Sequence, residues 1–304
     1  MHEWAEISDT IVAFDPATLE RQPVLKASVV ERFRRAGNAR AMRVVQQIPD
    51  SQGILEPAAV DRLLVSVHCE MQRISEEFQH GQRVLELVRP LIGVARTSNP
   101  SRVVRIVDVG CGTGFVIRWL AAHGALGHDV ELVGVDYNEA LVAEARRLAE
   151  VENLRCTFHV ANAFRLDPPG AIYLSTGVIH HFRNGDLSDF LAQHDRPDTA
   201  AFLHFDFQPS RMAPLGAWLF HAVRMRSALA KHDGVVSARR AYSGAMLLST
   251  GSVATSNFAL GMFSTRLWRL PIPRAFHTLI GIRRELRDAF VAALGRRASR
   301  LELQ

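Results

Sequence analysis

VDVGCGTG, at residues 107–114, is the stretch of this sequence that decides the fold. The apolar residues at its start predict a buried strand, after which the chain must turn sharply into a helix. Glycine permits that turn, because without a Cβ the backbone adopts a positive φ and lets a ligand approach its N–H groups. The glycines concerned are Gly110, Gly112 and Gly114. This pattern predicts a ligand site at the end of a strand.

The spacing and the carboxylates around this turn narrow the choice of ligand. The glycines are spaced G-x-G-x-G, whereas a dinucleotide fold uses G-x-G-x-x-G, which argues against NAD. Asp136 follows about 20 residues beyond the turn, at the end of a second strand, where a carboxylate can accept hydrogen bonds from both ribose hydroxyls. Asp108 is placed to orient the turn or the amino group of a ligand, and Tyr137 could lie against an adenine.

From about residue 98 onward, short apolar runs alternate with helical stretches, which is typical of a parallel α/β sheet. Strands are expected at 103–109, 131–136, 156–160, 171–175 and 200–206, with helices at 114–123, 138–150 and 185–193. The opening order is βαβαβ, so right-handed crossovers follow.

The sequence on either side of this core has a different character. Residues 1–97 contain no convincing strand and predict helices at about 26–47, interrupted at Gly37, then at 57–78 and 81–89, where Pro90 should end or kink the last one. Residues 209–256 predict a helical insertion over the active face. After it, 258–268 and 275–282 flank LPIP at 270–273, which suits an antiparallel hairpin at a sheet edge, and a basic helix at 284–301 closes the chain.

Four motifs recur in a known order. VDVGCGTG, GVDYN at 134–138, ANAF at 161–164 and LSTGVIHHF at 174–182 resemble the successive cofactor-binding motifs of class I S-adenosylmethionine-dependent methyltransferases, over residues 103–206. The resemblance implies a doubly wound, seven-stranded, mostly parallel sheet with an antiparallel last strand, which FHTLIGIRR at 276–284 resembles. We therefore expect a helical extension or lid at 1–97 and a methyltransferase domain at 98–304 that contains the insertion.

The resemblance also implies roles for single residues. The cofactor set it indicates is Asp108, Gly110, Cys111, Gly112 and Gly114 around the methionine portion, Asp136 at the ribose, Tyr137 at the adenine face, Asn162 and Ala163 at the adenine edge, and Thr176 at the end of the fourth strand. Many relatives carry an aspartate where Asn162 stands. A neutral amide oxygen accepts the same hydrogen bond from the adenine amino group more weakly.

Methyl transfer from a sulfonium is an in-line displacement on an activated carbon, so positioning can supply up to about 7–11 kcal/mol of the barrier reduction. His181 is the first candidate for a proton acceptor, because it occupies the position of the family's HH(F/L) motif; the alternative, that it only orients the loop or the cofactor, stays open. His204 and Asp206 end the fifth strand on one side and could bind substrate or a metal. Without a third ligand, no metal is predicted.

Composition sets the remaining expectations. With 304 residues, 48% of them hydrophobic, the chain can bury a full core, and it has neither a signal-like start nor an apolar run of about 20 residues, so we expect a cytoplasmic protein without membrane insertion. Three widely separated cysteines predict reduced thiols.

Three functions compete at this stage. Apolar helical material beside the cofactor core favours a methyltransferase that acts on O, N or C of a small, fairly apolar molecule. The pI near 9.6 motivates an RNA methyltransferase, but no RNA-binding signature or NPPY-like tetrad accompanies it, which argues against nucleic acid as a partner. The third is a non-catalytic cofactor-binding protein in which the helical extension forms a homodimer.

Overall fold

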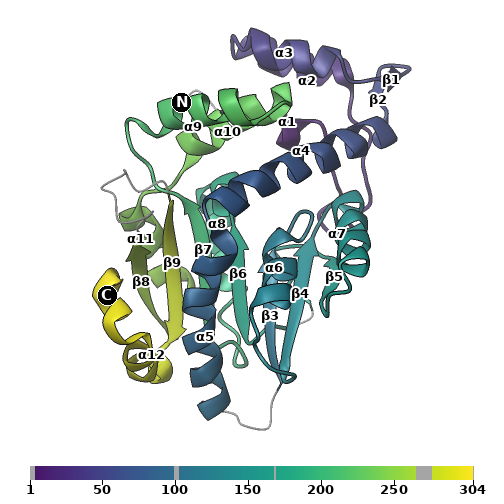
Figure 1. Cartoon of the computed structure of the whole chain (residues 1–304). Coiled ribbons are helices and arrows are strands. Elements are labelled where there is room, and N and C mark those ends of the chain that lie inside the picture. The colour runs from purple at the N-terminus through teal and green to yellow at the C-terminus, as the bar shows by residue number, and fades with distance from the viewer. Residues whose placement is uncertain (1–3, 99–102, 168, 265–275, 304) are drawn as a thin grey trace. The chain divides into compact units, whose positions relative to one another are not determined.

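The computed structural model describes residues 4–98, 103–167, 169–264 and 276–303 (Figure 1). Its contacts divide the chain into a larger unit, residues 75–208 with 241–304, and a smaller unit, residues 1–74 with 209–240. The boundaries expected from the sequence are 1–97 and 98–304. In the structure, residues 75–97 belong to the larger unit, and the 209–256 segment is divided, because residues 209–240 group with the N-terminal segment.

The larger unit is built on one eight-stranded sheet with the order β10-β8-β9-β7-β6-β3-β4-β5. In chain order the strands are β3 Val104–Val109, β4 Val130–Asp136, β5 Thr157–Val160, β6 Ile172–Thr176, β7 Ala201–Phe207, β8 Phe258–Ser264, β9 Phe276–Arg283 and β10 Leu301–Leu303. The strands β3 to β7 are mutually parallel, and β9 pairs antiparallel with both β7 and β8. This confirms the predicted α/β fold and the reversed strand at 276–284.

Helices cover both faces of this sheet, as its two separate clusters of buried apolar side chains indicate. The helices of the larger unit are α5 His80–Ser98, α6 Phe115–His123, α7 Glu139–Val151, α8 Asn184–Ala192, α11 Gly244–Ala254 and α12 Arg287–Leu294. Side chains of β7 alternate between the clusters: Leu203 and Phe205 lie with α5 and α12, and Phe202 lies with α8 and α11. Because helices pack on both faces of this parallel sheet, its strands must be apolar on both faces.

Two predicted helix bounds at the margins of the sheet are corrected. The helix predicted at 81–89 does not end at Pro90 but continues as α5 to Ser98, because the lost hydrogen bond is outweighed by a buried apolar face that includes Val88 and Leu91. The predicted helix at 284–301 is α12 flanked by short 3-10 turns, and Gly295, with φ +56°, ends it. The chain then pairs with β8 as an eighth strand. The LPIP segment at 270–273 lies outside the described residues.

The smaller unit is mainly helical. It contains α1 Ile7–Thr10, α2 Lys26–Arg35, α3 Ala39–Gln46, most of α4 Pro57–Glu77, α9 Ala213–Arg224, α10 Ala228–Arg240 and two short strands, β1 Asp50–Ser51 and β2 Ile54–Leu55. The helix interrupted at Gly37 and the helix at 57–78 are confirmed; the expectation of no strand before residue 97 is corrected by β1 and β2. Asp233 joins the two sequence segments by accepting hydrogen bonds from the Ile7 and Ser8 amides at 2.8 and 2.9 Å. Within the described ranges, no helix is long and apolar enough to cross a membrane.

Candidate functional site

The glycine-rich turn has the predicted backbone conformation. Gly110, Gly112 and Gly114 have φ angles of +70°, +54° and +75°. A Cβ on Gly110 would lie 2.7 Å from Cγ2 of Val178, and one on Gly114 would lie 2.4 Å from the ring of Phe158. At these two positions the protein's own side chains therefore exclude a Cβ, in addition to any demand made by a ligand.

Asp136, at the end of β4, connects the glycine turn to the next helix. One carboxylate oxygen accepts a hydrogen bond from the Gly112 amide at 2.9 Å, and the other accepts one from the Asn138 amide, also at 2.9 Å. A carboxylate has acceptor positions on both oxygens, the arrangement that a pair of ribose hydroxyls requires. The side chain is 6% exposed, and the backbone N–H groups hold it in place.

Asp108 is a buried carboxyl group with one oxygen that accepts no hydrogen bond within the described residues. It lies in β3 immediately before the turn and is 1% exposed, and its Oδ1 has no hydrogen-bond partner within the described residues. Burial and the neighbouring Asp136 raise the pKa of Asp108 well above its usual value. A buried unpaired polar group costs about 1–3 kcal/mol. A cationic group of a ligand would remove that cost, and this fits the ammonium of a bound amino acid moiety.

The other predicted cofactor residues lie at the same edge of the sheet. Tyr137 follows β4 and is 43% exposed, Asn162 and Ala163 follow β5, and Thr176 ends β6. The Asn162 side chain accepts a hydrogen bond from the Phe164 amide at 2.8 Å, which orients its amide group. Because parallel strands end at a common edge, the structure brings the predicted set together at the carboxyl ends of β3 to β6.

An imidazole and a carboxylate meet at the ends of β6 and β7. His180 lies in the 3-10 helix η1 Ile179–His181, which follows β6, and Asp206 lies in β7. Asp206 accepts hydrogen bonds from Nδ1 of His180 at 2.8 Å and from its amide at 3.0 Å. Burial raises the pKa of Asp206, but His180 outweighs it and holds the pKa below its usual value. With Nδ1 donating to the carboxylate, Nε2 is the basic nitrogen of His180.

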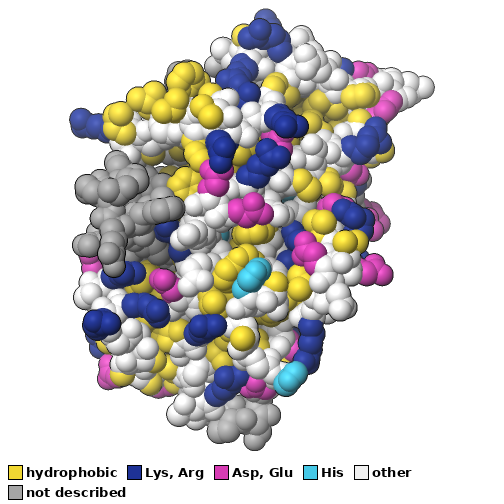
Figure 2. Space-filling model, viewed as in Figure 1, with side chains coloured by type: hydrophobic (Ala, Val, Ile, Leu, Met, Phe, Trp, Pro, Cys, Tyr) yellow, Lys and Arg dark blue, Asp and Glu magenta, His cyan; other side chains and the backbone are white. Residues whose placement is uncertain are grey.

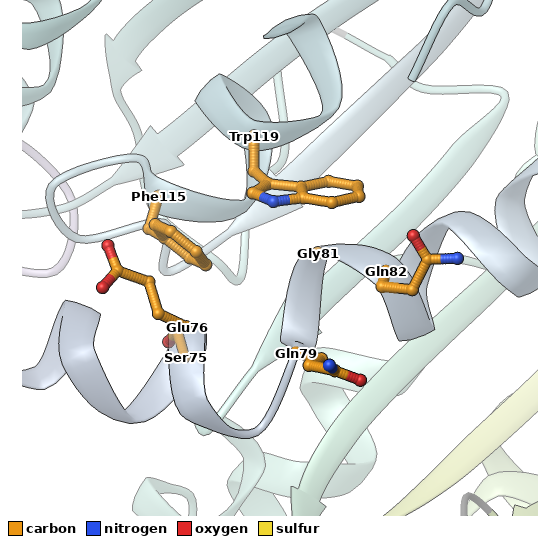
Figure 3. A pocket seen from close by; sticks show the side chains of 7 residues that line it. All are labelled: Ser75, Glu76, Gln79, Gly81, Gln82, Phe115 and Trp119. Atoms are coloured by element: carbon orange, nitrogen blue, oxygen red, sulfur yellow. The ribbon is translucent and has the colours of Figure 1, made fainter. Parts of the chain in front are cut away.

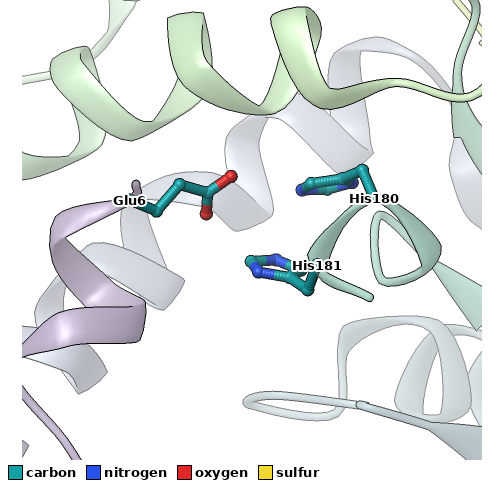
Figure 4. A group of neighbouring side chains, drawn as sticks. All are labelled: Glu6, His180 and His181. Atoms are coloured by element: carbon teal, nitrogen blue, oxygen red, sulfur yellow. The ribbon is translucent and has the colours of Figure 1, made fainter. Parts of the chain in front are cut away.

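His181, the predicted proton acceptor, lies directly beside this pair (Figure 4). Its ring centroid is 4.3 Å from that of His180, and the two planes make an angle of 33°. His180 is buried, whereas His181 is only half-buried. Glu6, which is also drawn in Figure 4, belongs to the smaller unit, where it accepts a hydrogen bond from the Ser237 hydroxyl.

His204 has a different environment from the one the sequence suggested. It shares a face of β7 with Asp206, as predicted, but it is fully buried against the rings of Phe190 and His194. Its Nδ1 lies 2.9 Å from the Ser175 hydroxyl, and burial lowers the pKa of His204 well below its usual value. The interpretation of His204 as a substrate or metal ligand is therefore wrong, because its neighbours are core residues.

Sequence reasoning did not predict the pairing of His180 with Asp206. The two residues are 26 positions apart, and the only available signal was that both follow or end neighbouring strands.

A pocket of about 390 Å³ beside α6 was also not predicted (Figure 3). Its lining residues are Ser75, Glu76, Gln79, Gly81, Gln82, Phe115 and Trp119. Gly81 allows the close approach of the indole, since a Cβ there would lie 2.2 Å from the ring of Trp119. The indole also stacks on the ring of His123, with a centroid distance of 4.8 Å.

Comparison with known proteins agrees with this geometry. Residues 106–196, from β3 through the His180 and His181 turn to α8, match the family model of a methyltransferase domain. The match identifies this stretch as a methyltransferase domain. No curated protein sequence matches the chain.

Several solved structures are similar to this methyltransferase. Magnesium protoporphyrin IX methyltransferase from Synechocystis is 18% identical, with 85% of this chain and 99% of that chain covered and a TM-score of 0.44. A TehB-like methyltransferase from Corynebacterium glutamicum is 14% identical, with coverages of 69% and 99% and a TM-score of 0.40. The plantazolicin methyltransferase BpumL is 12% identical, with coverages of 74% and 96% and a TM-score of 0.49. Similarity at this level carries no information about the acceptor.

Proposed function

We propose that this methyltransferase transfers a methyl group from S-adenosylmethionine to O, N or C of a small, fairly apolar molecule. The observation that carries the proposal is the unpartnered Oδ1 of Asp108, buried directly beside three glycines in the left-handed conformation. A carboxyl group of this kind fits the ammonium of the methionine portion. The exposed N–H groups of the turn suit the rest of that moiety.

The cofactor residues then have separate tasks. Asp108 and the turn from Gly110 to Gly114 hold the methionine portion, and Asp136, which the Gly112 and Asn138 amides orient, binds the ribose hydroxyls. Further along the edge, Tyr137 covers the adenine face, Asn162 and Ala163 line its edge, and Thr176 closes the set. When bound, S-adenosylmethionine supplies an electrophilic methyl group.

His181 is the proposed proton acceptor for the attacking atom. Asp206 anchors His180 through two hydrogen bonds, and the ring of His180 in turn supports that of His181. His180 is thus a positioning residue, while the half-buried His181 is the imidazole of the pair with exposed surface. A histidine can take up a proton near neutral pH, so no stronger base is required.

Two features favour a small apolar acceptor over RNA. Phe207 lies next to His180, with ring centroids 5.6 Å apart, and Phe276 follows at 5.0 Å from Phe207, so apolar rings adjoin the imidazole that supports the proposed base. On the face shown in Figure 2, Lys and Arg side chains are dispersed among acidic and apolar ones. Nucleic-acid sites use clustered basic residues.

The test is formation of S-adenosylhomocysteine with a panel of small phenols, amines and activated carbon acids, together with titration of the enzyme by S-adenosylhomocysteine. We expect cofactor binding and a single methylated product with at least one panel member. Binding without turnover on any acceptor would favour a non-catalytic role. RNA affinity that falls steeply with added salt, together with methylated RNA, would favour the nucleic-acid alternative.

A further inference from the structure

Two buried basic side chains on α5 have no role in the site described above. His80 and Arg83 lie one helical turn apart and are each 8% exposed. Both ring nitrogens of His80, and Nε and Nη1 of Arg83, have no hydrogen-bond partner among the residues that the structure describes. A buried guanidinium without an acceptor is rare, because its desolvation is not compensated.

Within the described residues, no carboxylate forms a salt bridge with Arg83. The acidic residue that acts on Arg83 through its charge is Glu86, which lies 4.0 Å from the guanidinium of Arg300. Segment 265–275, which leads into Phe276, contains no Asp or Glu. Burial and the charge of Arg83 lower the pKa of His80 to about 4, so His80 is neutral at pH 7 and the local charge is that of Arg83.

A continuous row of rings connects these side chains to His180, the imidazole beside the proposed base His181. From His180 the row passes to Phe207, then to Phe276 and then to His80, with successive centroid distances of 5.6, 5.0 and 4.9 Å. The hydroxyl of Thr278, two residues after Phe276 and therefore on the same face of β9, is also fully buried without a partner in the described structure.

The two basic side chains lie on the side of α5 that faces β9. His80 packs against Phe276 of β9, whereas the neighbouring Gly81 packs against Trp119 of α6. His80 and Arg83 also lie in the first turn of α5, where the helix dipole favours an anion.

We propose that His80 and Arg83 form an anion subsite that binds a carboxylate of the methyl acceptor, whose apolar body lies along Phe207 and Phe276. The inference rests on the proposed function and narrows its substrate class to small aromatic or apolar carboxylic acids. A guanidinium fork accommodates both oxygens of a carboxylate. The imidazole adds a further donor.

The test compares two probes of equal shape. 4-Hydroxybenzoate and 4-hydroxybenzamide are titrated into the enzyme saturated with S-adenosylhomocysteine, by calorimetry or ligand-observed NMR. We expect the carboxylate to bind at least about tenfold more tightly than the amide, as a charge-assisted hydrogen bond would give. Arg83→Met should reduce this preference to less than about twofold, with S-adenosylhomocysteine affinity unchanged.

The matched control is Arg96→Met on the same helix, where Arg96 pairs with Asp129 at the surface and the carboxylate preference should persist. Equal affinity of the two probes for the wild-type enzyme, or an unchanged preference in Arg83→Met, would overturn the subsite. Reduced S-adenosylhomocysteine affinity with an unchanged preference would assign the anion to the cofactor instead. If Arg83→Met does not fold, the wild-type preference decides, and Arg83→Lys should retain only part of it. An enzyme that does not bind S-adenosylhomocysteine would contradict the proposed function, which is a different outcome from the loss of the preference alone.

Discussion

The two halves of the central sheet have opposite chemistry at the same edge. The half formed by β3, β4 and β5 presents carboxylates, Asp108 and Asp136, beside an open backbone turn. The half formed by β6, β7 and β9 presents imidazoles, His180 and His181, with apolar rings next to them. One half suits a cationic, hydroxyl-rich donor and the other suits proton removal from an apolar acceptor. Under the proposed function, the donor binds at one half of the sheet edge and the acceptor is activated at the other.

The largest effect should come from the imidazole half. Removing the proposed base in His181→Ala should lower kcat by about 100-fold, the lower end of what general base catalysis contributes, while the affinity for S-adenosylhomocysteine stays within about twofold. Steady-state kinetics and a binding titration measure the two quantities. The control is His128→Ala, an exposed histidine in the larger unit. A kcat equal to that of the wild type would leave His181 only an orienting role.

The carboxylate half should respond in affinity instead of turnover. Asp136→Asn retains an acceptor for only one of the two amides, Gly112 and Asn138, and weakens the binding of hydroxyls, so S-adenosylhomocysteine affinity should fall by about 30-fold. The surface substitution Asp129→Asn serves as the control. Unchanged affinity measured by calorimetry would remove Asp136 from the cofactor site.

Asp108→Asn should raise the stability of the ligand-free protein and lower its affinity for S-adenosylhomocysteine. The raised pKa of Asp108 means that the folded state holds a proton that the unfolded state has lost, so this group reduces stability as pH rises above about 4. At pH 7 the asparagine should therefore stabilise the ligand-free protein by about 1–2 kcal/mol, yet bind S-adenosylhomocysteine about tenfold more weakly. Thermal melts with and without the ligand test both signs, and a destabilised ligand-free variant would contradict the prediction.

The smallest effect concerns the pH dependence of stability, to which His194, a buried histidine of the imidazole half, contributes. Burial lowers the pKa of His194 to about 4. Between pH 6.5 and 4 the unfolded state therefore binds a proton that the folded state does not bind, and the free energy of unfolding falls as the pH falls. His194→Phe removes this group and should reduce the loss of unfolding free energy between pH 7 and pH 5 by about 1 kcal/mol. Urea unfolding at both pH values measures it, with His128→Ala as the exposed counterpart. An identical pH dependence in His194→Phe and wild type would exclude this contribution.

The strands of the core could be predicted to within two residues, because buried parallel strands form apolar runs that end at glycine, asparagine or aspartate. The margins could not. Pro90 signals a helix end, but α5 continues through it because its apolar face packs on the sheet. Residues 301–303 carry no strong strand signal and become β10 only because β8 offers a free edge.

By itself the sequence determined the donor end of the protein: the glycine turn, Asp136 and the order of the motifs follow from requirements of the local backbone. A positive φ needs glycine, and a carboxylate that ends a parallel strand lies at the ligand-binding edge. The tertiary structure alone decided the pairing of His180 with Asp206, the burial of His204 and the burial of Arg83. Partners and burial depend on which distant segments pack together, and a linear pattern does not contain that information.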